Sequence, residues 1–346
     1  MSSIELIFSS VFNCALFFVF VFFINILGIL IYKRIAINLG ILANPNFRTL
    51  HETSVPRGAG IVFSSTFILG VFVLFYFNFL SKDLFFILGF GGAMATIFGL
   101  IDDIFDIRAI YKFLIQICLS IWMLIFFDDG SLFSEVGFLA TIKILLFILF
   151  IVWMINAYNF MDGIDGMAIS GAFYVSFTLT LITLITNGSL ELVVLFTLLM
   201  ASTCAFMLFN WPPASIFMGD SGSIFLGYLF GSFILITIIK DEISLWTWLV
   251  IFGYFFADTT VTQIARIILV KNFLKPHRSH AYQNLARITS SHLKVTGWVT
   301  FYHIFWLLPL SIWTVLIPNM ELIAVFCAII PGFIIAYRYG PVFSSS

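Results

Sequence analysis

Residues 85–108 read FFILGFGGAMATIFGLIDDIFDIR, and this stretch decides the class of fold. Residues 85–101 are uncharged and mostly apolar, and three carboxylates follow at Asp102, Asp103 and Asp106. A helix needs about 20 mostly apolar residues to cross about 30 Å of hydrocarbon. The stretch therefore predicts a membrane-spanning helix that ends in an acidic cluster at the membrane surface.

The rest of the chain repeats this apolar pattern. Hydrophobic residues make up 62% of the 346 residues and charged residues only 10%. Counting 85–101, the candidate spans are 10–31, 59–79, 85–101, 111–127, 138–156, 168–186, 190–209, 221–239, 244–269, 297–316 and 320–338. We therefore expect an all-α polytopic membrane protein with about 11 transmembrane helices. Since these spans use most of the chain, residues 1–346 should form a single integral membrane domain.

The basic residues divide unequally between the two faces of such a protein. The loops and span ends that follow odd-numbered spans hold Lys33, Arg34, Arg48, Arg57, Arg108, Lys112, Arg266, Lys271, Lys275, Arg278, Arg287, Lys294 and Arg338. The other side holds only Lys82, Lys143 and Lys240. Because basic residues collect on the cytoplasmic side of a membrane, the N-terminus should be periplasmic and the C-terminus cytoplasmic.

The dense polar clusters also follow odd-numbered spans. They lie at 44–60, 102–108, 156–166, 210–222 and 275–284, whereas the loops of the other face are short and hold no comparable motif. A transporter usually places its polar binding groups near the middle of the bilayer. A one-sided arrangement instead favours an active site on the cytoplasmic face, where a water-soluble donor meets a lipid acceptor.

The acidic clusters indicate a divalent cation. Adjacent carboxylates such as Asp102 and Asp103 repel each other unless a cation lies nearby, and Mg²⁺ commonly joins carboxylates to substrate phosphates. If the helix continues beyond the span, Asp102 and Asp106 share a face. Taken alone, this cluster has one less favoured alternative, a solvated helix end beside Arg108.

Two further motifs add carboxylates to the same face. NAYNFMDGIDGMA, residues 156–168, contains Asn159, Asp162 and Asp165. FNWPPASIFMGDSGS, residues 209–223, contains Asn210, Phe217 and Asp220. Glycines around these aspartates allow tight turns and let backbone N–H groups approach phosphate oxygens.

Two basic segments complete the set. NFRTLHETSVPRGAG, residues 46–60, supplies Arg48, His51 and Arg57, and KPHRSHAYQ, residues 275–283, supplies Lys275, His277, Arg278 and His280. Arginine and histidine bind phosphate oxygens, although a cytoplasmic loop also accumulates basic residues for topological reasons. A zinc site at the two histidines is an alternative without a local third ligand. Asp258, inside the ninth span, is a functional candidate, but a structural pair with a neighbour such as Gln263 or Arg266 explains it equally well, so its role stays open.

In this order the motifs resemble the polyprenyl-phosphate N-acetylhexosamine-1-phosphate transferase family, glycosyltransferase family 4. The segments that carry the resemblance are PNFRTLHETSVPRGAG, DDIFD, NAYNFMDGIDGMA, NWPPASIFMGDSGS and HRSHAYQNL. They look closest to the branch that initiates O-antigen, since the peptidoglycan branch has a basic residue at the position of Asp106. This chain also reads PRGAG where the family usually reads PRGGG, so Ala59 replaces a glycine.

The resemblance implies a role for each motif residue. Asp220 would be a direct Mg²⁺ ligand, with Mn²⁺ as an alternative ion, and Asp102 and Asp103 would lie beside the metal and the donor pyrophosphate. Asp162 and Asp165 would be the other catalytic carboxylates and would shape the nucleotide pocket. The implied substrate contacts are Arg48, His51, Arg57, Asn159, Asn210, Phe217 on uracil, and His277, Arg278 and His280 on phosphate.

The implied activity is transfer of N-acetylhexosamine-1-phosphate from a UDP-sugar to undecaprenyl phosphate, with release of UMP. It would initiate O-antigen or a related surface polysaccharide, in lipopolysaccharide or cell wall biogenesis, at the bacterial inner membrane. The expected partners are the UDP-N-acetylhexosamine, undecaprenyl phosphate and membrane lipids, with no nucleic acid, and a homodimer stays open. The alternatives are a peptidoglycan-type transferase of the same family and a carrier for lipid-linked sugars.

Overall fold

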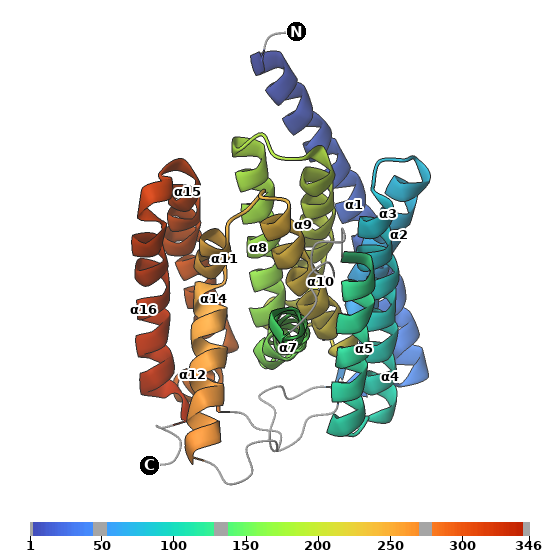
Figure 1. The fold of residues 1–346 in the computed structure, drawn as a ribbon. Coiled ribbons are helices and arrows are strands. Elements are labelled where there is room, and N and C mark those ends of the chain that lie inside the picture. The colour runs from blue at the N-terminus through green and yellow to red at the C-terminus, as the bar shows by residue number, and fades with distance from the viewer. Residues whose placement is uncertain (1–2, 44–53, 128–137, 270–278, 342–346) are drawn as a thin grey trace.

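The protein is almost entirely helical in a computed structural model, which describes residues 3–43, 54–127, 138–269 and 279–341. Figure 1 shows the helices packed side by side, with most of them running between the same two ends of the molecule. The elements are α1 (Ser3–Leu39), β1 (Leu42–Ala43), β2 (Val55–Pro56), α2 (Gly60–Tyr76), α3 (Lys82–Leu84), the π-helix η1 (Phe85–Gly91), α4 (Gly92–Phe105), α5 (Ala109–Phe127), α7 (Phe138–Met161), α8 (Met167–Ile185), α9 (Leu190–Asn210), α10 (Asp220–Ile239), α11 (Leu245–Ile251), α12 (Gly253–Leu269), α13 (Ala281–Thr289), α14 (His292–Tyr302), the π-helix η2 (His303–Leu307), α15 (Leu308–Leu316), the 3₁₀ helix η3 (Pro318–Met320) and α16 (Glu321–Tyr339).

All eleven predicted spans are helical, which confirms the all-α polytopic fold. Within the described residues, nine helical stretches are long and apolar enough to cross a membrane. The second predicted span, α2, has 17 residues and is slightly shorter. The ninth, predicted as one segment over 244–269, is instead interrupted at Phe252, where α11 ends and α12 begins at Gly253.

Helix α10 lies at the centre of the bundle. It is the most buried of the candidate spans, and it packs against α4, α7 and α2. Two of its glycines allow close backbone contacts. A Cβ at Gly227 would lie 2.6 Å from the Cα of Ile155 in α7, and one at Gly222 would lie 2.9 Å from the Cα of Gly60 in α2. The start of α10, which begins at Asp220, is therefore held closely by its neighbours.

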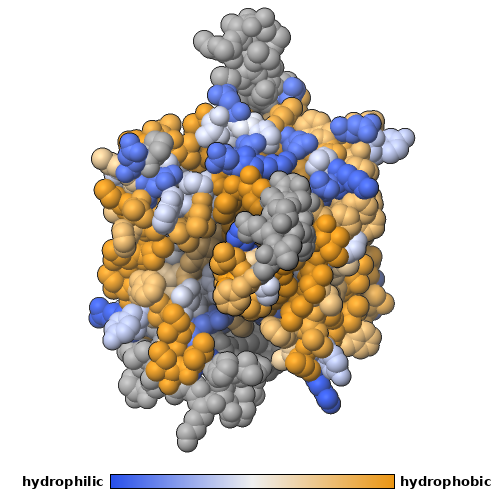
Figure 2. Space-filling view, in the orientation of Figure 1, coloured by the Kyte–Doolittle hydropathy of each residue, from blue (hydrophilic) through white to orange (hydrophobic). Residues whose placement is uncertain are grey.

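The outer helices present apolar side chains to the surroundings. Helix α1 is the least buried candidate span, and exposed leucine, isoleucine and phenylalanine side chains occur along α1, α5 and α16. In Figure 2 hydrophobic residues cover most of the middle of the molecule, and hydrophilic residues gather towards its ends. Such a surface is stable in lipid rather than in water.

The two ends of the chain lie at opposite ends of the molecule (Figure 1). This arrangement requires an odd number of crossings, as the sequence predicts. Which end faces the cytoplasm stays a prediction from the distribution of basic residues.

Candidate active site

The C-terminal end of α4 meets the N-terminal end of α10. Asp103 accepts hydrogen bonds from the backbone N–H groups of Asp220, at 3.0 Å, and Ser221, at 3.1 Å. Free N–H groups at a helix start carry partial positive charge, so they stabilise a carboxylate there. Gly219 has a φ of 73°, and a Cβ at this position would lie 2.5 Å from Oδ2 of Asp103. Glycine is therefore needed where the two helices meet.

Lys112 joins two of the predicted carboxylates. Its Nζ, projecting from α5, forms an ion pair with Oδ2 of Asp102 and lies 3.5 Å from Oδ2 of Asp220. Asp102 is also held by its own turn, because its Oδ1 accepts a hydrogen bond from the N–H of Ile107 at 2.9 Å. The structure thus brings Asp102, Asp103 and Asp220 together from α4 and α10, with one ammonium group among them.

Asp106 does not share the helix face of Asp102 that the sequence led us to expect. Helix α4 ends at Phe105, and Asp106 adopts a left-handed conformation with a φ of 48°. Its side chain is exposed. Aspartate tolerates this conformation at a helix end, so Asp106 lies exposed beyond α4 rather than on its helical face.

Asp162 adds a fourth carboxylate to the site from the turn after α7. Burial raises the pKa of Asp162 well above its ordinary value, and the charges of Asp220, Asp103 and Asp165 raise it further. Each of these carboxylates disfavours ionisation of the others unless a proton or a cation is present. The DGIDG turn therefore belongs to the same site as the DD pair.

Asp165 connects the turn after α7 to two other segments. Its Oδ2 accepts a hydrogen bond from the N–H of Ala214 at 3.0 Å, and its Oδ1 lies 3.1 Å from Nδ1 of His292 in α14. The hydroxyl group of Thr296 donates to the carbonyl group of Asp165 at 2.7 Å. In this arrangement the carboxylate of Asp165 holds the turn, the loop before α10 and α14 in register.

Two asparagines also link the motifs. Asn210 is buried, and it accepts from the N–H of Gly166 at 3.1 Å while donating to the carbonyl group of Ile216 at 2.8 Å. Asn159 accepts a hydrogen bond from the hydroxyl group of Ser223 in α10 at 3.2 Å. Both side chains therefore fix the two glycine-containing motifs relative to each other.

The PRGAG segment runs along the loop that precedes α10. The N–H of Ala59 donates to the carbonyl group of Phe217 at 3.1 Å, and the N–H of Phe217 donates to that of Pro56 at 2.8 Å. Arg57 donates from Nη2 to the carbonyl group of Asp103 at 2.6 Å. Ala59 has a φ of −76°, which alanine adopts without strain, so its presence in place of glycine is accommodated here.

Sequence reasoning assigned no site role to Lys112 or to a polar pair beneath it. Gln116, one turn further along α5, exchanges two hydrogen bonds with Asn156 of α7, at 3.3 and 2.7 Å. The sequence offered two signals for this link. Lys112 and Gln116 share a helix face by their spacing, and an intramembrane glutamine requires a partner.

Four predicted substrate contacts, Arg48, His51, His277 and Arg278, lie outside the described residues. His280 is described, and it is buried beside Asp258 rather than beside the four carboxylates. Phe217 is half-buried where the PRGAG segment crosses the loop before α10.

The carboxylates have the chemistry that Mg²⁺ requires. Among the described residues, no three histidine, cysteine or acidic side chains are grouped as a ready metal site. Mg²⁺, however, is usually held by one or two carboxylates together with substrate phosphates and water. Asp102 and Asp220 already approach one cationic group, the ammonium of Lys112. These two residues could hold Mg²⁺ when phosphates supply the remaining ligands.

Comparison with known proteins places this site in a family. Residues 85–238 match the family model of glycosyl transferase family 4. A probable undecaprenyl-phosphate N-acetylglucosaminyl 1-phosphate transferase of Bacillus subtilis is 30% identical over 285 residues, which cover 78% of each chain. A phospho-N-acetylmuramoyl-pentapeptide-transferase of Fervidobacterium nodosum is 29% identical over 295 residues, 79% of this chain and 87% of the relative. A decaprenyl-phosphate N-acetylglucosaminephosphotransferase of Mycobacterium leprae is 26% identical over 299 residues, 74% of each chain.

The chain belongs to glycosyl transferase family 4, which confirms the resemblance drawn from its motifs. It is accordingly a phosphoglycosyltransferase. Its apolar helices and its bacterial relatives make it a multi-pass protein of the bacterial inner membrane.

Proposed function

We propose that this protein transfers an N-acetylhexosamine-1-phosphate from a UDP-sugar to undecaprenyl phosphate and releases UMP. Transfer of a phospho-sugar is what the names of its relatives have in common, and two of these names give a polyprenyl phosphate as the acceptor. We add to this shared activity the UDP-sugar as donor, the undecaprenyl chain of the acceptor and UMP as the product.

The observation that carries the proposal is the charge arrangement at the start of α10. Asp102 and Asp220 contact Lys112, Asp103 accepts from the first N–H groups of α10, and Asp162 lies nearby. Lysine can pair with a phosphate oxygen, and the carboxylates can hold a cation that also binds phosphate. One site can therefore hold both a pyrophosphate donor and a phosphate acceptor.

The proposed reaction is a displacement at phosphorus. An oxygen of the lipid phosphate attacks the β-phosphorus of the UDP-sugar, the bond from this phosphorus to the bridging oxygen breaks, and UMP leaves. Asp102 would accept the last proton of the lipid phosphate. Because the second pKa of a phosphate monoester is about 6, most of that proton is already lost near neutrality, and the base would assist only modestly.

Charge neutralisation would accelerate the reaction more than proton transfer to Asp102. Lys112 lies where it can balance charge on a phosphate, and Asp220 with Asp102 would hold Mg²⁺, with Mn²⁺ as an alternative. When bound, such an ion would neutralise the pyrophosphate and polarise its phosphoryl oxygens. Asp103 would keep the start of α10 in place while this charge develops.

The nucleotide end of the donor would lie beside the DGIDG turn. Phe217 would stack on uracil, and Asn159, Arg57, Arg48 and His51 would add polar contacts. We assign Asp165 and Asn210 to shaping this pocket, because the contacts described above use their side chains to fix its walls. His277 and Arg278 would serve the phosphate groups, whereas His280 is buried beside Asp258 and is not assigned to them.

The lipid chain requires an apolar surface within the part of the protein that spans the bilayer. A cavity of about 290 Å³ lies among α7, α10, α11, α12 and α16, with Trp153, Trp248 and Phe256 in its lining. Apolar cavities of this kind suit isoprenoid units. We assign to it part of the undecaprenyl chain.

Surface polysaccharide initiation, of the O-antigen type or a related type, is the biosynthetic role we propose. Asp106 stands where the peptidoglycan branch has a basic residue, which favours this role. An N-acetylglucosaminyl 1-phosphate transferase and a phospho-N-acetylmuramoyl-pentapeptide-transferase both align over most of the chain. The donor that the protein uses therefore distinguishes the two activities.

The test is release of UMP by the purified protein in detergent, given undecaprenyl phosphate, Mg²⁺ and one donor at a time. We expect activity with UDP-N-acetylglucosamine, UDP-N-acetylfucosamine or UDP-N-acetylquinovosamine. Activity only with UDP-N-acetylmuramoyl-pentapeptide would favour the peptidoglycan-type reaction. Transport of a lipid-linked sugar without UMP release would indicate a carrier and contradict the proposal.

A further inference from the structure

Asp258 is a buried carboxylate within α12, outside the site described above. Its side chain has no exposed surface. The hydroxyl group of Thr262, one turn along the same helix, donates to Oδ1 at 3.1 Å. A buried carboxylate is costly unless its oxygens are fully hydrogen-bonded, so the origin of its other donors identifies what it holds.

The other donors come from the start of α13. The N–H of Ala281 donates to Oδ1 of Asp258 at 3.0 Å, and the N–H of Tyr282 donates to Oδ2 at 3.2 Å. These are the first two N–H groups of the nine-residue helix, which lack partners within the helix itself. Asp258 therefore caps α13 from another helix, with one oxygen for each backbone group.

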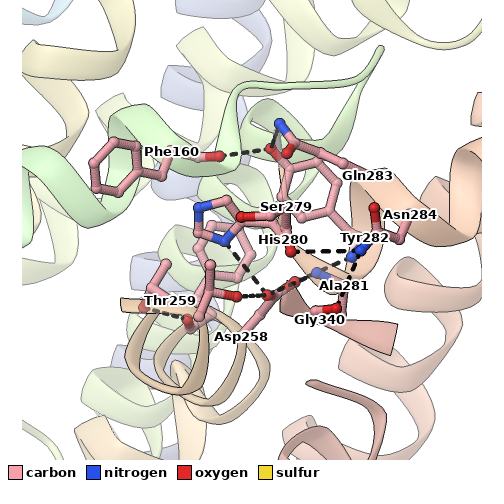
Figure 3. Close-up of polar contacts among 12 residues, drawn as sticks. Phe160, Asp258, Thr259, Ser279, His280, Ala281, Tyr282, Gln283, Asn284 and Gly340 are labelled. Atoms are coloured by element: carbon pink, nitrogen blue, oxygen red, sulfur yellow. Dashed lines mark hydrogen bonds and ion pairs between the residues drawn. The ribbon is translucent and has the colours of Figure 1, made fainter. Parts of the chain in front are cut away.

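His280 completes the contacts of Asp258. Its Nδ1 lies 3.4 Å from Oδ1, and its ring packs 5.6 Å from that of Phe160 and 5.8 Å from that of Tyr282, measured between ring centroids. Figure 3 shows the imidazole directed at Asp258, between the end of α7 and the start of α13. A carboxylate at Nδ1 fixes the orientation of an imidazole ring.

Helix α13 is fixed in turn to the segment that carries Asp162. The hydroxyl group of Tyr282 donates to the carbonyl group of Phe160 at 2.5 Å (Figure 3). A Cβ at Gly163 would lie 2.2 Å from that hydroxyl oxygen and 2.3 Å from Nε2 of Gln283. Tyr282 and Gln283 of α13 therefore pack closely against the turn that contains Asp162.

We propose that Asp258 is a positioning residue, which holds His280 and α13 against the Phe160–Gly163 turn and thereby sets the position of Asp162. This role of Asp258 rests on the proposed function, in which the turn borders the nucleotide end of the donor. Asp258 accepts from the backbone N–H of Tyr282, and the hydroxyl group of Tyr282 donates to the carbonyl group of Phe160. Asp258 itself need not touch a substrate.

Two variants separate the parts of this connection. Asp258→Asn keeps the shape of the side chain but replaces one acceptor oxygen by a donor, so it weakens the cap. Tyr282→Phe keeps the cap and removes the hydroxyl group, which donates to Phe160 and accepts from Gln283. Thr314→Val is the matched control, because it removes a buried hydrogen bond with Thr247, at 2.8 Å, that joins α11 to α15 without touching α13.

We expect Asp258→Asn and Tyr282→Phe each to raise the KM for the UDP-sugar about tenfold, with the KM for the lipid phosphate unchanged. Because both act through one connection, the double variant should resemble Asp258→Asn alone. Thr314→Val should leave both KM values unchanged. Multiplicative effects in the double variant, or equal changes in both KM values, would overturn the proposal.

Hydrogen exchange provides a measurement that does not depend on catalysis. The amides of residues 162–166 should exchange faster in Asp258→Asn and in Tyr282→Phe than in the wild-type protein, and not in Thr314→Val. If the wild-type protein released no UMP from any donor, the proposed function would fail while this measurement still tested the positioning role. Unchanged exchange in both variants of a folded protein would overturn that role.

Discussion

Lys112 is the residue on which the charge balance of the site depends. It contacts Asp102 and Asp220, which come from two different helices, and no other described lysine or arginine has an ion pair with either. Removing one partner of a partly buried ion pair leaves charge uncompensated, which costs more than the pair itself contributes. Lys112 therefore stabilises the fold as well as serving the proposed reaction.

Lys112→Met should lower the free energy of unfolding by about 1–3 kcal/mol in Mg²⁺-free buffer, because Asp102 and Asp220 then face each other without a cation. Added Mg²⁺ should restore more of the lost Tm in this variant than it adds to the wild-type protein, since the ion can occupy the same charge position. Thermal unfolding in detergent measures both effects, with Lys112→Arg as the charge-preserving control. An equal Mg²⁺ effect in all three proteins would contradict this prediction.

Asp162→Asn should stabilise the protein in a pH-dependent manner. The pKa of Asp162 is raised in the folded state, so its carboxyl group destabilises that state as the pH rises from the unfolded pKa of about 4 towards the folded value. The gain from asparagine should therefore be small near about pH 4 and largest above the folded pKa. It is measured as the change in Tm across pH without Mg²⁺.

Asp106→Asn is the control for this pH series, since Asp106 is exposed and an asparagine also tolerates its left-handed conformation. We expect no comparable gain from that variant. A gain at Asp162 that was constant with pH, or larger under acidic conditions, would show that relief of charge is not its cause.

At the scale of the helices, the site exists because three helix ends converge. The end of α4 and the starts of α2 and α10 meet where Gly60, Gly99 and Gly222 remove side chains from the contacts. A Cβ at Gly99 would lie 2.2 Å from the carbonyl oxygen of Asp220, and one at Gly60 would lie 2.3 Å from the backbone of Gly222. Backbone against backbone leaves little scope for adjustment.

Gly60→Ala should therefore destabilise the protein by about 1–3 kcal/mol, since α2 must move away from α10. Gly297→Ala is the matched control, because a Cβ at that position in α14 has nothing within 4 Å. There the substitution should be neutral or should stabilise the protein by about 0.4–1 kcal/mol. Thermal unfolding of the two variants compares them directly. Equal Tm values would show that the α2–α10 contact is not constrained as described.

The sequence predicted the helices because long apolar segments have few structural alternatives in a membrane. It also predicted that the motif carboxylates gather at one end of the bundle, because polar residues at span ends are conspicuous, but not that α4 ends before Asp106. It did not predict the break at Phe252 or the pairing of Lys112 with Asp102 and Asp220. Both depend on how helices that are distant in the chain pack together, and a basic residue at a cytoplasmic span end has a topological explanation that conceals such a pairing.

The contacts of Asp258 are a second feature that the sequence did not predict, because most of its partners are distant in the chain. The sequence marked it as an intramembrane carboxylate and suggested Gln263 or Arg266 as neighbours. In the structure its donors are Thr262 on the same helix and the start of α13, more than twenty residues further along the chain. Only the packing of α13 against α12 reveals this contact.

For the molecule as a whole, the motifs lie at one end of a bundle whose termini are at opposite ends. The distribution of basic residues predicts that this end faces the cytoplasm, where nucleotide sugars are available. The same orientation leaves the short loops near Lys82 and Lys240 in the periplasm.

Single cysteines test this orientation. In a background without Cys14, Cys118, Cys204 and Cys327, Lys82→Cys and Lys240→Cys should react with an impermeant maleimide on intact spheroplasts. Arg108→Cys, which is exposed at the other end, should react only after the membrane is permeabilised. Labelling of Arg108→Cys on intact spheroplasts would show that the protein has the opposite orientation.

Asp220, together with Asp102 and Lys112, forms the proposed centre of phospho-sugar transfer. The most direct measurement is UMP release by Asp220→Asn with Mg²⁺, the preferred UDP-sugar and undecaprenyl phosphate. Asp241→Asn, an exposed aspartate just after the other end of α10, serves as the control. We predict a loss of at least about 10²-fold for Asp220→Asn and none for Asp241→Asn. Full UMP release by a folded Asp220→Asn protein would show that Asp220 is not part of this centre.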